Sequence, residues 1–181
     1  MIEWTTTYIA SQILVIIVYV CLCTTYFLKD RKKILILNLF AHIIQAISFL
    51  LLGGMTGVAM NGVYVARDIL FITEKNKDTK AVTKKDIIIL VCFILLIIIF
   101  TLFTYDGLLS LLSVIATIIS TFAIWQKNTK LYKVLGIPTS IAWLGYHISL
   151  NSVFAITLEG VLLISTIIGY ILEVLKNKKN K

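Results

Sequence analysis

The chain is poor in charge, in proline and in cysteine, and each shortage excludes a class of protein. Only 14% of its 181 residues are charged, whereas soluble globular domains have about a quarter, so an ordinary soluble domain is excluded. A single proline and nine glycines exclude a disordered or collagen-like chain. The three cysteines lie inside apolar runs, which is typical of small buried side chains rather than of disulfides or metal ligands.

The usual motifs of catalysis are also missing. The sequence has no cluster of cysteine and histidine, no glycine-rich phosphate loop and no serine–histidine–aspartate arrangement. We therefore predict that the protein is not an enzyme and that it holds no metal or other cofactor.

Apolar sequence, by contrast, is abundant: 59% of the residues are hydrophobic and the mean hydropathy is +0.97. A membrane-spanning helix needs about 20 apolar residues, and seven such runs predict an all-α integral membrane protein with seven transmembrane helices. The predicted spans are Tyr8–Leu28, Ile34–Gly53, Met55–Thr73, Ile87–Tyr105, Leu108–Gln126, Leu131–Leu150 and Ser152–Leu175. Because so few residues separate the second span from the third and the sixth from the seventh, both pairs are predicted to be tight hairpins.

The basic residues gather on one side of these predicted spans. Sixteen of the seventeen follow the first, third, fifth or seventh span, and the connections on the opposite side contain none. The positive-inside rule makes the basic side cytoplasmic, with the N-terminus outside and the C-terminus inside. Such a fringe attracts anionic membrane lipids and predicts no nucleic-acid binding. The sixteen are Lys29, Arg31, Lys32, Lys33, Lys75, Lys77, Lys80, Lys84, Lys85, Lys127, Lys130, Lys133, Lys176, Lys178, Lys179 and Lys181.

An internal repeat is predicted as well. A shift of 98 residues, which moves Asn61 onto Glu159, lays the first three spans over the last three and matches their hairpins and basic loops. The intervening fourth span restores the orientation of the second copy, which predicts a 3+1+3 parallel repeat of three-helix bundles. Residues 1–181 thus form one membrane domain, in which we expect a first bundle (8–73), a basic loop and linker helix (74–107), a second bundle (108–175) and a basic cytoplasmic tail (176–181).

Polar side chains at helical spacing in four of the spans give a candidate site. A polar or ionisable side chain inside a bilayer is costly, so it is by default a functional hypothesis. We expect the polar stripes of both halves to line a central cavity for a small polar solute. The candidate substrate-binding residues are Asn61, Glu159, Arg67, Asp68, His42, Gln45, Trp143, His147 and Asn151.

The chemistry of each side chain suggests its role. Glu159 would accept a cation, an amine or a proton, and Asn61 would hydrogen-bond a polar group. Arg67 would hold an anionic group or pair with Asp68 or Glu159, and Trp143 would supply an apolar wall. Each group also has a structural alternative. Arg67 could snorkel to lipid phosphates, the amides could join helices, and the two histidines could be hydrogen-bonded packing residues.

Parts of both halves resemble the YgjV-type bacterial inner-membrane proteins. The similar residues are Phe49-Leu50-Leu51-Leu52-Gly53, Thr56-Gly57, Asn61 and Arg67, then Ser113-Val114-Ile115-Ala116-Thr117, Ser120, Trp143, Asn151 and Glu159-Gly160. The resemblance covers nearly the whole chain and implies a bacterial cytoplasmic membrane, but it implies no particular reaction.

The predicted architecture resembles that of the SWEET and PnuC transporters. In SWEET proteins a matched pair of asparagines on the third and seventh helices contacts the substrate, and here the matched pair is Asn61 and Glu159. We therefore expect a small-solute transporter that works by alternating access. The alternative is a non-transporting membrane subunit or regulator, in which the polar residues only join helices. The sequence leaves the solute and the oligomeric state open.

Overall fold

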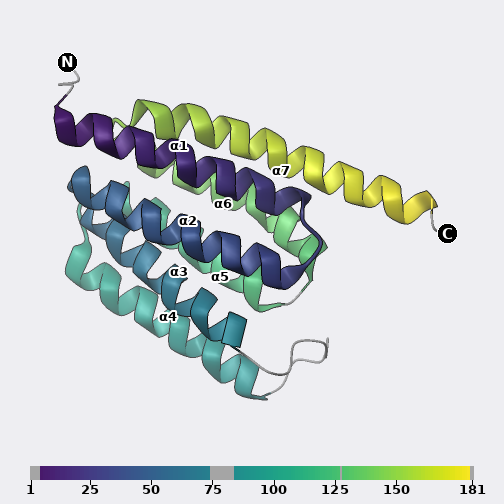
Figure 1. Cartoon of the computed structure of the whole chain (residues 1–181). Coiled ribbons are helices and arrows are strands. Elements are labelled where there is room, and N and C mark those ends of the chain that lie inside the picture. Colours follow the sequence, from purple (N-terminus) through teal and green to yellow (C-terminus); the bar gives the residue numbers. More distant parts are fainter. Residues whose placement is uncertain (1–4, 74–83, 127, 180–181) are drawn as a thin grey trace.

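The computed structural model describes residues 5–73, 84–126 and 128–179, without the side chains of residues 173 and 176–179. Within these ranges the chain forms seven helices and no strand, which confirms the predicted all-α class (Figure 1). The helices are α1 (Thr6–Phe27), α2 (Arg31–Leu51), α3 (Met55–Thr73), α4 (Lys84–Thr104), α5 (Ser110–Trp125), α6 (Thr129–Ser149) and α7 (Val153–Lys179). Some of the basic residues assigned above to the cytoplasmic side lie outside the described residues: Lys75, Lys77, Lys80, Lys127, Lys181 and the side chains of Lys176, Lys178 and Lys179.

Side-chain caps fix where α2 and α6 begin. Asp30 accepts hydrogen bonds from the backbone N–H groups of Lys32 (2.8 Å) and Lys33 (3.4 Å). Asn128 does the same at α6, where the N–H groups of Lys130 (3.0 Å) and Leu131 (3.4 Å) donate to its side chain. Because a capped first turn is stable in water, both helices begin a few residues before the predicted apolar span. At the other end of the chain, α7 continues to Lys179, through residues that were predicted as a tail.

Two tight turns of the same construction join α2 to α3 and α6 to α7. Gly53 (φ 75°) and Asn151 (φ 51°) occupy the left-handed region that ends a helix in a Schellman motif. The backbone N–H of the next residue donates back to Phe49 O in the first turn (2.9 Å) and to His147 O in the second (3.2 Å). The donor and the acceptor of the second turn lie 98 residues after those of the first turn, and the same shift separates Asn151 from Gly53. The bounds of α2 and α6 differ by the same shift.

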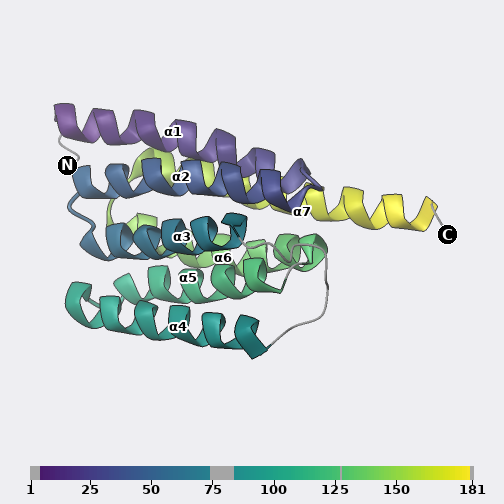
Figure 2. The ribbon, with the colours of Figure 1, turned by 60° about the horizontal axis from the view of Figure 1, so that its bottom comes forward.

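Six of the helices form a ring. Its neighbours are α1 and α2, α2 and α3, α3 and α5, α5 and α6, α6 and α7, and finally α7 and α1. Helix α4 packs against α3 and α5 from outside this ring, and it lies along one edge in both views of the ribbon (Figures 1 and 2). Of the described side chains of α4, only Asp86, Phe93 and Ile97 are buried.

The outer surface is apolar, as a bilayer requires. Exposed side chains include Ile13, Leu102, Phe103 and Ile164, and Phe103 is 83% exposed. Side chains of this kind can face hydrocarbon without loss, because lipid tails are as apolar as they are. Four helices are long and apolar enough to cross a membrane, namely α1, α2, α4 and the part of α7 over Val153–Leu172. Helix α5 is apolar but has only 16 residues.

Candidate functional site

A cavity of about 70 Å³ lies inside the six-helix ring. All six ring helices line it, whereas none of the described residues of α4 does. One water needs roughly 10–15 Å³ of such space, so a few waters or one small solute fit. The polar lining consists of Asn38, His42 and Gln45 of α2, Asn61 of α3, Ser120 of α5, Thr139, Ser140 and His147 of α6, and Glu159 of α7, together with several tyrosines.

Four packed rings close the cavity towards the tight turns, and we call them the turn-end cap: Phe49, Trp143, Tyr146 and His147. Phe49 stacks on Trp143 and on His147, with ring centroids 5.6 Å and 5.5 Å apart, while Tyr146 meets Phe49 edge-on at 5.6 Å. Gly57 supports the cap, since a Cβ atom there would lie 2.8 Å from the Phe49 ring. The backbone N–H of Gly57, in the first turn of α3 where helices leave such groups unpaired, donates to the Tyr146 hydroxyl (2.9 Å).

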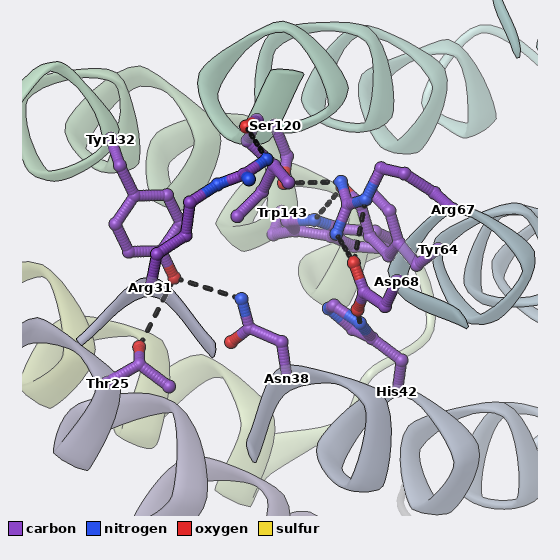
Figure 3. A network of polar contacts seen from close by, with 11 residues as sticks. Thr25, Arg31, Asn38, His42, Tyr64, Arg67, Asp68, Ser120, Tyr132 and Trp143 are labelled. Atoms are coloured by element: carbon purple, nitrogen blue, oxygen red, sulfur yellow. Dashed lines mark hydrogen bonds and ion pairs between the residues drawn. The ribbon is translucent and has the colours of Figure 1, made fainter. Parts of the chain in front are cut away.

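A smaller layer closes the opposite end, where α1 meets the loop to α2. Tyr26 of α1 and Tyr132 of α6 stack with their centroids 5.4 Å apart, and we call them the loop-end pair. The Tyr132 hydroxyl lies 3.2 Å from the Thr25 hydroxyl and accepts a 3.3 Å hydrogen bond from Asn38 Nδ2 (Figure 3). Gly136 makes room for this pair, since a Cβ atom there would lie 2.6 Å from the Tyr26 hydroxyl oxygen.

An ion-pair network joins α2, α3 and α5 at the side of the cavity (Figure 3). Arg67 donates two hydrogen bonds to Asp68 Oδ1, from Nε (2.9 Å) and Nη2 (2.7 Å), and a third from Nη1 to the Ser120 hydroxyl (3.2 Å). The other carboxylate oxygen of Asp68 lies 2.9 Å from His42 Nδ1. Arg67 is completely buried, with its guanidinium over the Tyr64 ring, so the alternative that it snorkels to lipid phosphates is wrong. It pairs with Asp68 instead, and the two charges offset each other.

A second polar group surrounds Glu159. The Tyr19 hydroxyl of α1 donates to Glu159 Oε2 and also lies 3.1 Å from His147 Nε2. His147 Nε2 is in turn 3.8 Å from Glu159 Oε2. The side chains of three helices, α1, α6 and α7, thus meet at one carboxylate that is only 3% exposed.

The cavity wall also carries unused hydrogen-bonding atoms. Among the described residues, the buried side-chain atoms without a hydrogen-bond partner are Asn38 Oδ1, Gln45 Oε1, Thr121 Oγ1, His147 Nδ1 and Glu159 Oε1. All of these side chains except Thr121 line the cavity. Because buried polar atoms in proteins are nearly always paired, these atoms are available to form hydrogen bonds with a solute in the cavity.

Most of the residues expected from the sequence come together here. Six of them line the cavity, namely His42, Gln45, Asn61, Trp143, His147 and Glu159. Arg67 and Asp68 lie behind the wall, where they contact His42 and Ser120. Asn151, however, is exposed in the turn between α6 and α7, and its backbone oxygen accepts a hydrogen bond from Tyr8 (3.2 Å). The expectation that Asn151 lines the cavity is therefore wrong, because its left-handed backbone serves to end a helix.

Three aromatic residues of the site, Tyr19, Tyr26 and Tyr132, were missed by the sequence reasoning. A signal for two of them exists in the first span, where the polar side chains of Gln12, Tyr19 and Tyr26 recur at multiples of about one helical turn. The structure buries these three side chains on the inner face of α1. The helical spacing of polar residues in the first span therefore indicates Tyr19 and Tyr26.

The arrangement suits binding by hydrogen bonds and one carboxylate between aromatic walls. Within the described part of the chain, no group of three or more His, Cys, Asp or Glu side chains is placed to hold a metal ion. What the cavity does offer is amides, hydroxyls, two imidazoles and Glu159. These groups can orient a small polar solute and partly replace its hydration shell.

Comparisons with known proteins agree with the apolar, multi-helix architecture. Neither a curated protein nor a solved structure matches the chain, so the likeness to SWEET and PnuC transporters stays a prediction. One family model matches over residues 9–174, which includes the whole cavity lining, and it describes a bacterial inner membrane protein. The chain therefore belongs to the Imp-YgjV family of bacterial inner membrane proteins, as a multi-pass protein of the bacterial cytoplasmic membrane.

Proposed function

We propose that the protein is a small-solute transporter that works by alternating access. One observation carries this proposal: a cavity with polar groups in its wall lies in the middle of an apolar helix ring, between two layers of packed aromatic side chains. A binding site that must open to each side in turn needs a separate closure on each side. Transport needs no covalent chemistry, so the proposal also includes that the protein is not an enzyme.

The two halves, α1–α3 and α5–α7, would be the moving parts. The matching turns and helix bounds at a shift of 98 residues support a parallel repeat, with α4 as the linker that lies outside the ring. Both closures join a side chain of the first half to α6 of the second, Tyr26 to Tyr132 at one end and Phe49 to Trp143 at the other. A rocking motion of the halves would therefore separate one closure while it compresses the other.

The topology follows from the basic residues. Lys29, Arg31, Lys84, Lys85 and Lys130 lie at the end of the bundle that holds the loop-end pair, while Gly53-Gly54, Asp106-Gly107 and Asn151-Ser152 at the turn end contain no basic residue. The positive-inside rule makes the loop end cytoplasmic. All seven helices would then cross the membrane, with the N-terminus outside and the C-terminus inside.

Accessibility of the cavity from each side tests the proposal without knowledge of the solute. Ser140 lines the cavity and is 2% exposed, and Ser140→Cys changes its size little. The variant is made in a background in which Cys21, Cys23 and Cys92 are replaced by serine. A membrane-impermeant thiol reagent is then applied to spheroplasts and, separately, to inverted vesicles.

Alternating access predicts that Ser140→Cys reacts in both preparations, since each protein molecule opens to either side. Leu95→Cys, in the middle of α4 and 54% exposed on its outer face, is the matched control and should stay unmodified inside the hydrocarbon. Reaction from one side only, or from neither, contradicts the transporter and favours the non-transporting subunit or regulator.

A further inference from the structure

We infer that the cavity takes a small organic ammonium ion, held by Glu159 as counter-ion and by the free acceptor atoms of Asn38, Gln45 and His147. This inference rests on the proposed function and specifies its solute. The chemistry that recognises such an ion is a set of acceptors together with one uncompensated negative charge.

The unpartnered atoms of the cavity are acceptors. The side-chain oxygens of Asn38, Gln45 and Glu159 have lone pairs without a partner, and the hydrogen bond from Asn38 Nδ2 to Tyr132 leaves the Asn38 oxygen free. All three side chains are more than nine-tenths buried, at 2%, 7% and 3% exposure. A solute that satisfies them must bring hydrogen-bond donors, and a primary ammonium group brings three donors and no acceptor.

His147 adds a fourth acceptor. The Tyr19 hydroxyl has one proton, which it donates to Glu159, so its contact with Nε2 of His147 needs a proton on that ring nitrogen. In the neutral ring the other nitrogen, Nδ1, then carries a lone pair and has no partner. The hydrogen-bonded series His147–Tyr19–Glu159 therefore ends in a free acceptor on each side, Nδ1 of His147 and Oε1 of Glu159.

The charges around the cavity favour a cation over an anion or a neutral solute. The buried carboxylate of Asp68 is compensated by Arg67 and contacts His42 as well. Glu159 lies with the hydroxyls of Tyr19 and Ser140 and with His147, and has no Arg or Lys within salt-bridge distance among the described side chains. An uncompensated buried carboxylate is strongly unfavourable, and a bound cation offsets that penalty, as does a proton when the cavity is empty.

The walls and the volume fit a small cation. Phe49, Tyr64 and Trp143 line the cavity with aromatic rings, which can pack against the carbon atoms of such a solute. The volume of about 70 Å³ restricts the solute to a few non-hydrogen atoms in this conformation. A two-carbon amine such as ethanolammonium meets each of these requirements.

Equilibrium binding of radiolabelled ethanolammonium to the purified protein in lipid nanodiscs tests the inference. Ethylene glycol and glycolate are the competitors, because they have nearly the same shape and carry no charge or a negative charge. We expect saturable binding of ethanolammonium that neither competitor displaces. Loss of a hydrogen bond to a charged group lowers affinity by about 10- to 100-fold, so Glu159→Gln should weaken binding by that factor.

Thr121→Val is the matched control, because Thr121 has the unpartnered buried oxygen that does not face the cavity. It should leave binding unchanged. If Glu159→Gln fails to accumulate as folded protein, Gln45→Met removes an acceptor at similar size and should weaken binding by about fivefold or more. Absence of saturable binding, equal binding by Glu159→Gln and wild type, or equal competition by ethylene glycol overturns the inference.

The accessibility experiment keeps this failure distinct from failure of the transporter. If Ser140→Cys reacts from both sides while ethanolammonium does not bind, the transporter stands and its solute belongs to another class. If ethanolammonium binds while Ser140→Cys reacts from one side only, the cavity is an ammonium-binding site of a protein that does not transport.

Discussion

The two ends of the cavity are closed in different ways. At the turn end, each of the four rings packs on the other three, and Tyr146 ties the cap to the backbone of α3. At the loop end, one stacked pair, Tyr26 and Tyr132, is held by two long hydrogen bonds to the Tyr132 hydroxyl. Aromatic pairs contribute about 0.5–1.5 kcal/mol each beyond their buried area. Less packing must therefore be undone to open the loop end.

If the two halves rock as proposed, this difference favours opening at the loop end over opening at the turn end. It also implies that substitutions at the turn end should mainly affect stability, whereas those at the loop end should mainly affect access.

Removal of the central ring of the turn-end cap should have the largest effect. Phe49 is 1% exposed and contacts the three other rings, so Phe49→Ala leaves a cavity in the packing. Substitutions of this kind lower the free energy of unfolding by about 3–5 kcal/mol. Thermal or denaturant unfolding in detergent measures the change. Phe103→Ala, at a fully lipid-facing position, is the control, and equal losses in the two variants would contradict a structural role for the cap.

A methyl group beneath the cap should disturb it less. The Cβ atom of Gly57→Ala would lie 2.8 Å from the Phe49 ring, and overpacking of this kind destabilises by about 1–3 kcal/mol. Gly62→Ala in the same helix meets no atom within 4 Å and should stabilise slightly, because alanine favours helices over glycine. The unfolding temperatures of the two variants should move in opposite directions, and a shared direction would show that Gly57 is not needed for close packing.

The two buried tyrosine hydroxyls allow a matched comparison of the ends. Tyr146→Phe leaves the backbone N–H of Gly57 without its partner, which costs about 1–3 kcal/mol. Tyr132→Phe removes two long hydrogen bonds and should cost about 0.5–1.5 kcal/mol, since Thr25 keeps its bond to Leu22 O and the side-chain N–H of Asn38 faces the cavity, where water can accept its hydrogen bond. Unfolding of both variants in the same detergent checks the order. A larger loss for Tyr132→Phe would reverse the assignment of the stronger closure.

Gly136→Ala should have a small effect on stability and a clear effect on access. The new methyl group would push on the outer end of the Tyr26 side chain, which can swing aside, so we expect a loss of about 1 kcal/mol. Displacement of Tyr26 opens the loop-end pair, and Ser140→Cys should then react faster in inverted vesicles. Gly160→Ala, which meets no atom within 4 Å, should leave that rate unchanged. An unchanged rate in Gly136→Ala would show that the pair does not control entry.

Much of the fold follows from apolar runs in the sequence, and the errors have physical causes. Periodicity of apolar residues marks the spans, but it says nothing of the capped turns at Asp30 and Asn128, where polar residues are helical as well. The polar stripes of α2, α3, α6 and α7 identify most of the cavity wall, because buried polar groups in a membrane must face one another.

The geometry of individual side chains could not be predicted in this way. The spacing of polar residues in the third span places Arg67 and Asp68 close together. Whether the Arg67 side chain reaches lipid phosphates or pairs with Asp68 depends on side-chain packing, which the spacing does not show. Tyrosine occurs both in cores and at membrane interfaces, so the residue type alone does not indicate that Tyr19 contacts Glu159. Asn151 was assigned to the cavity from its spacing alone, and the spacing continues past the point where the helix ends.

The position of α4 outside the ring has a consequence for how the sequence can change over time. Phe93 and Ile97 are buried against the ring, and Ile89 and Leu96 pack partly buried beside them. The backbone oxygens of Asp86 and Thr104 accept hydrogen bonds from Trp125 (2.7 Å) and Thr56. Most other side chains of α4 are exposed on the side away from the ring. For such positions any apolar residue serves equally well. Among relatives, α4 should therefore exchange Ile, Leu, Val and Phe almost at random, with positions 93 and 97 varying least. A helix that links the halves in this way preserves its length and its hydropathy rather than its sequence.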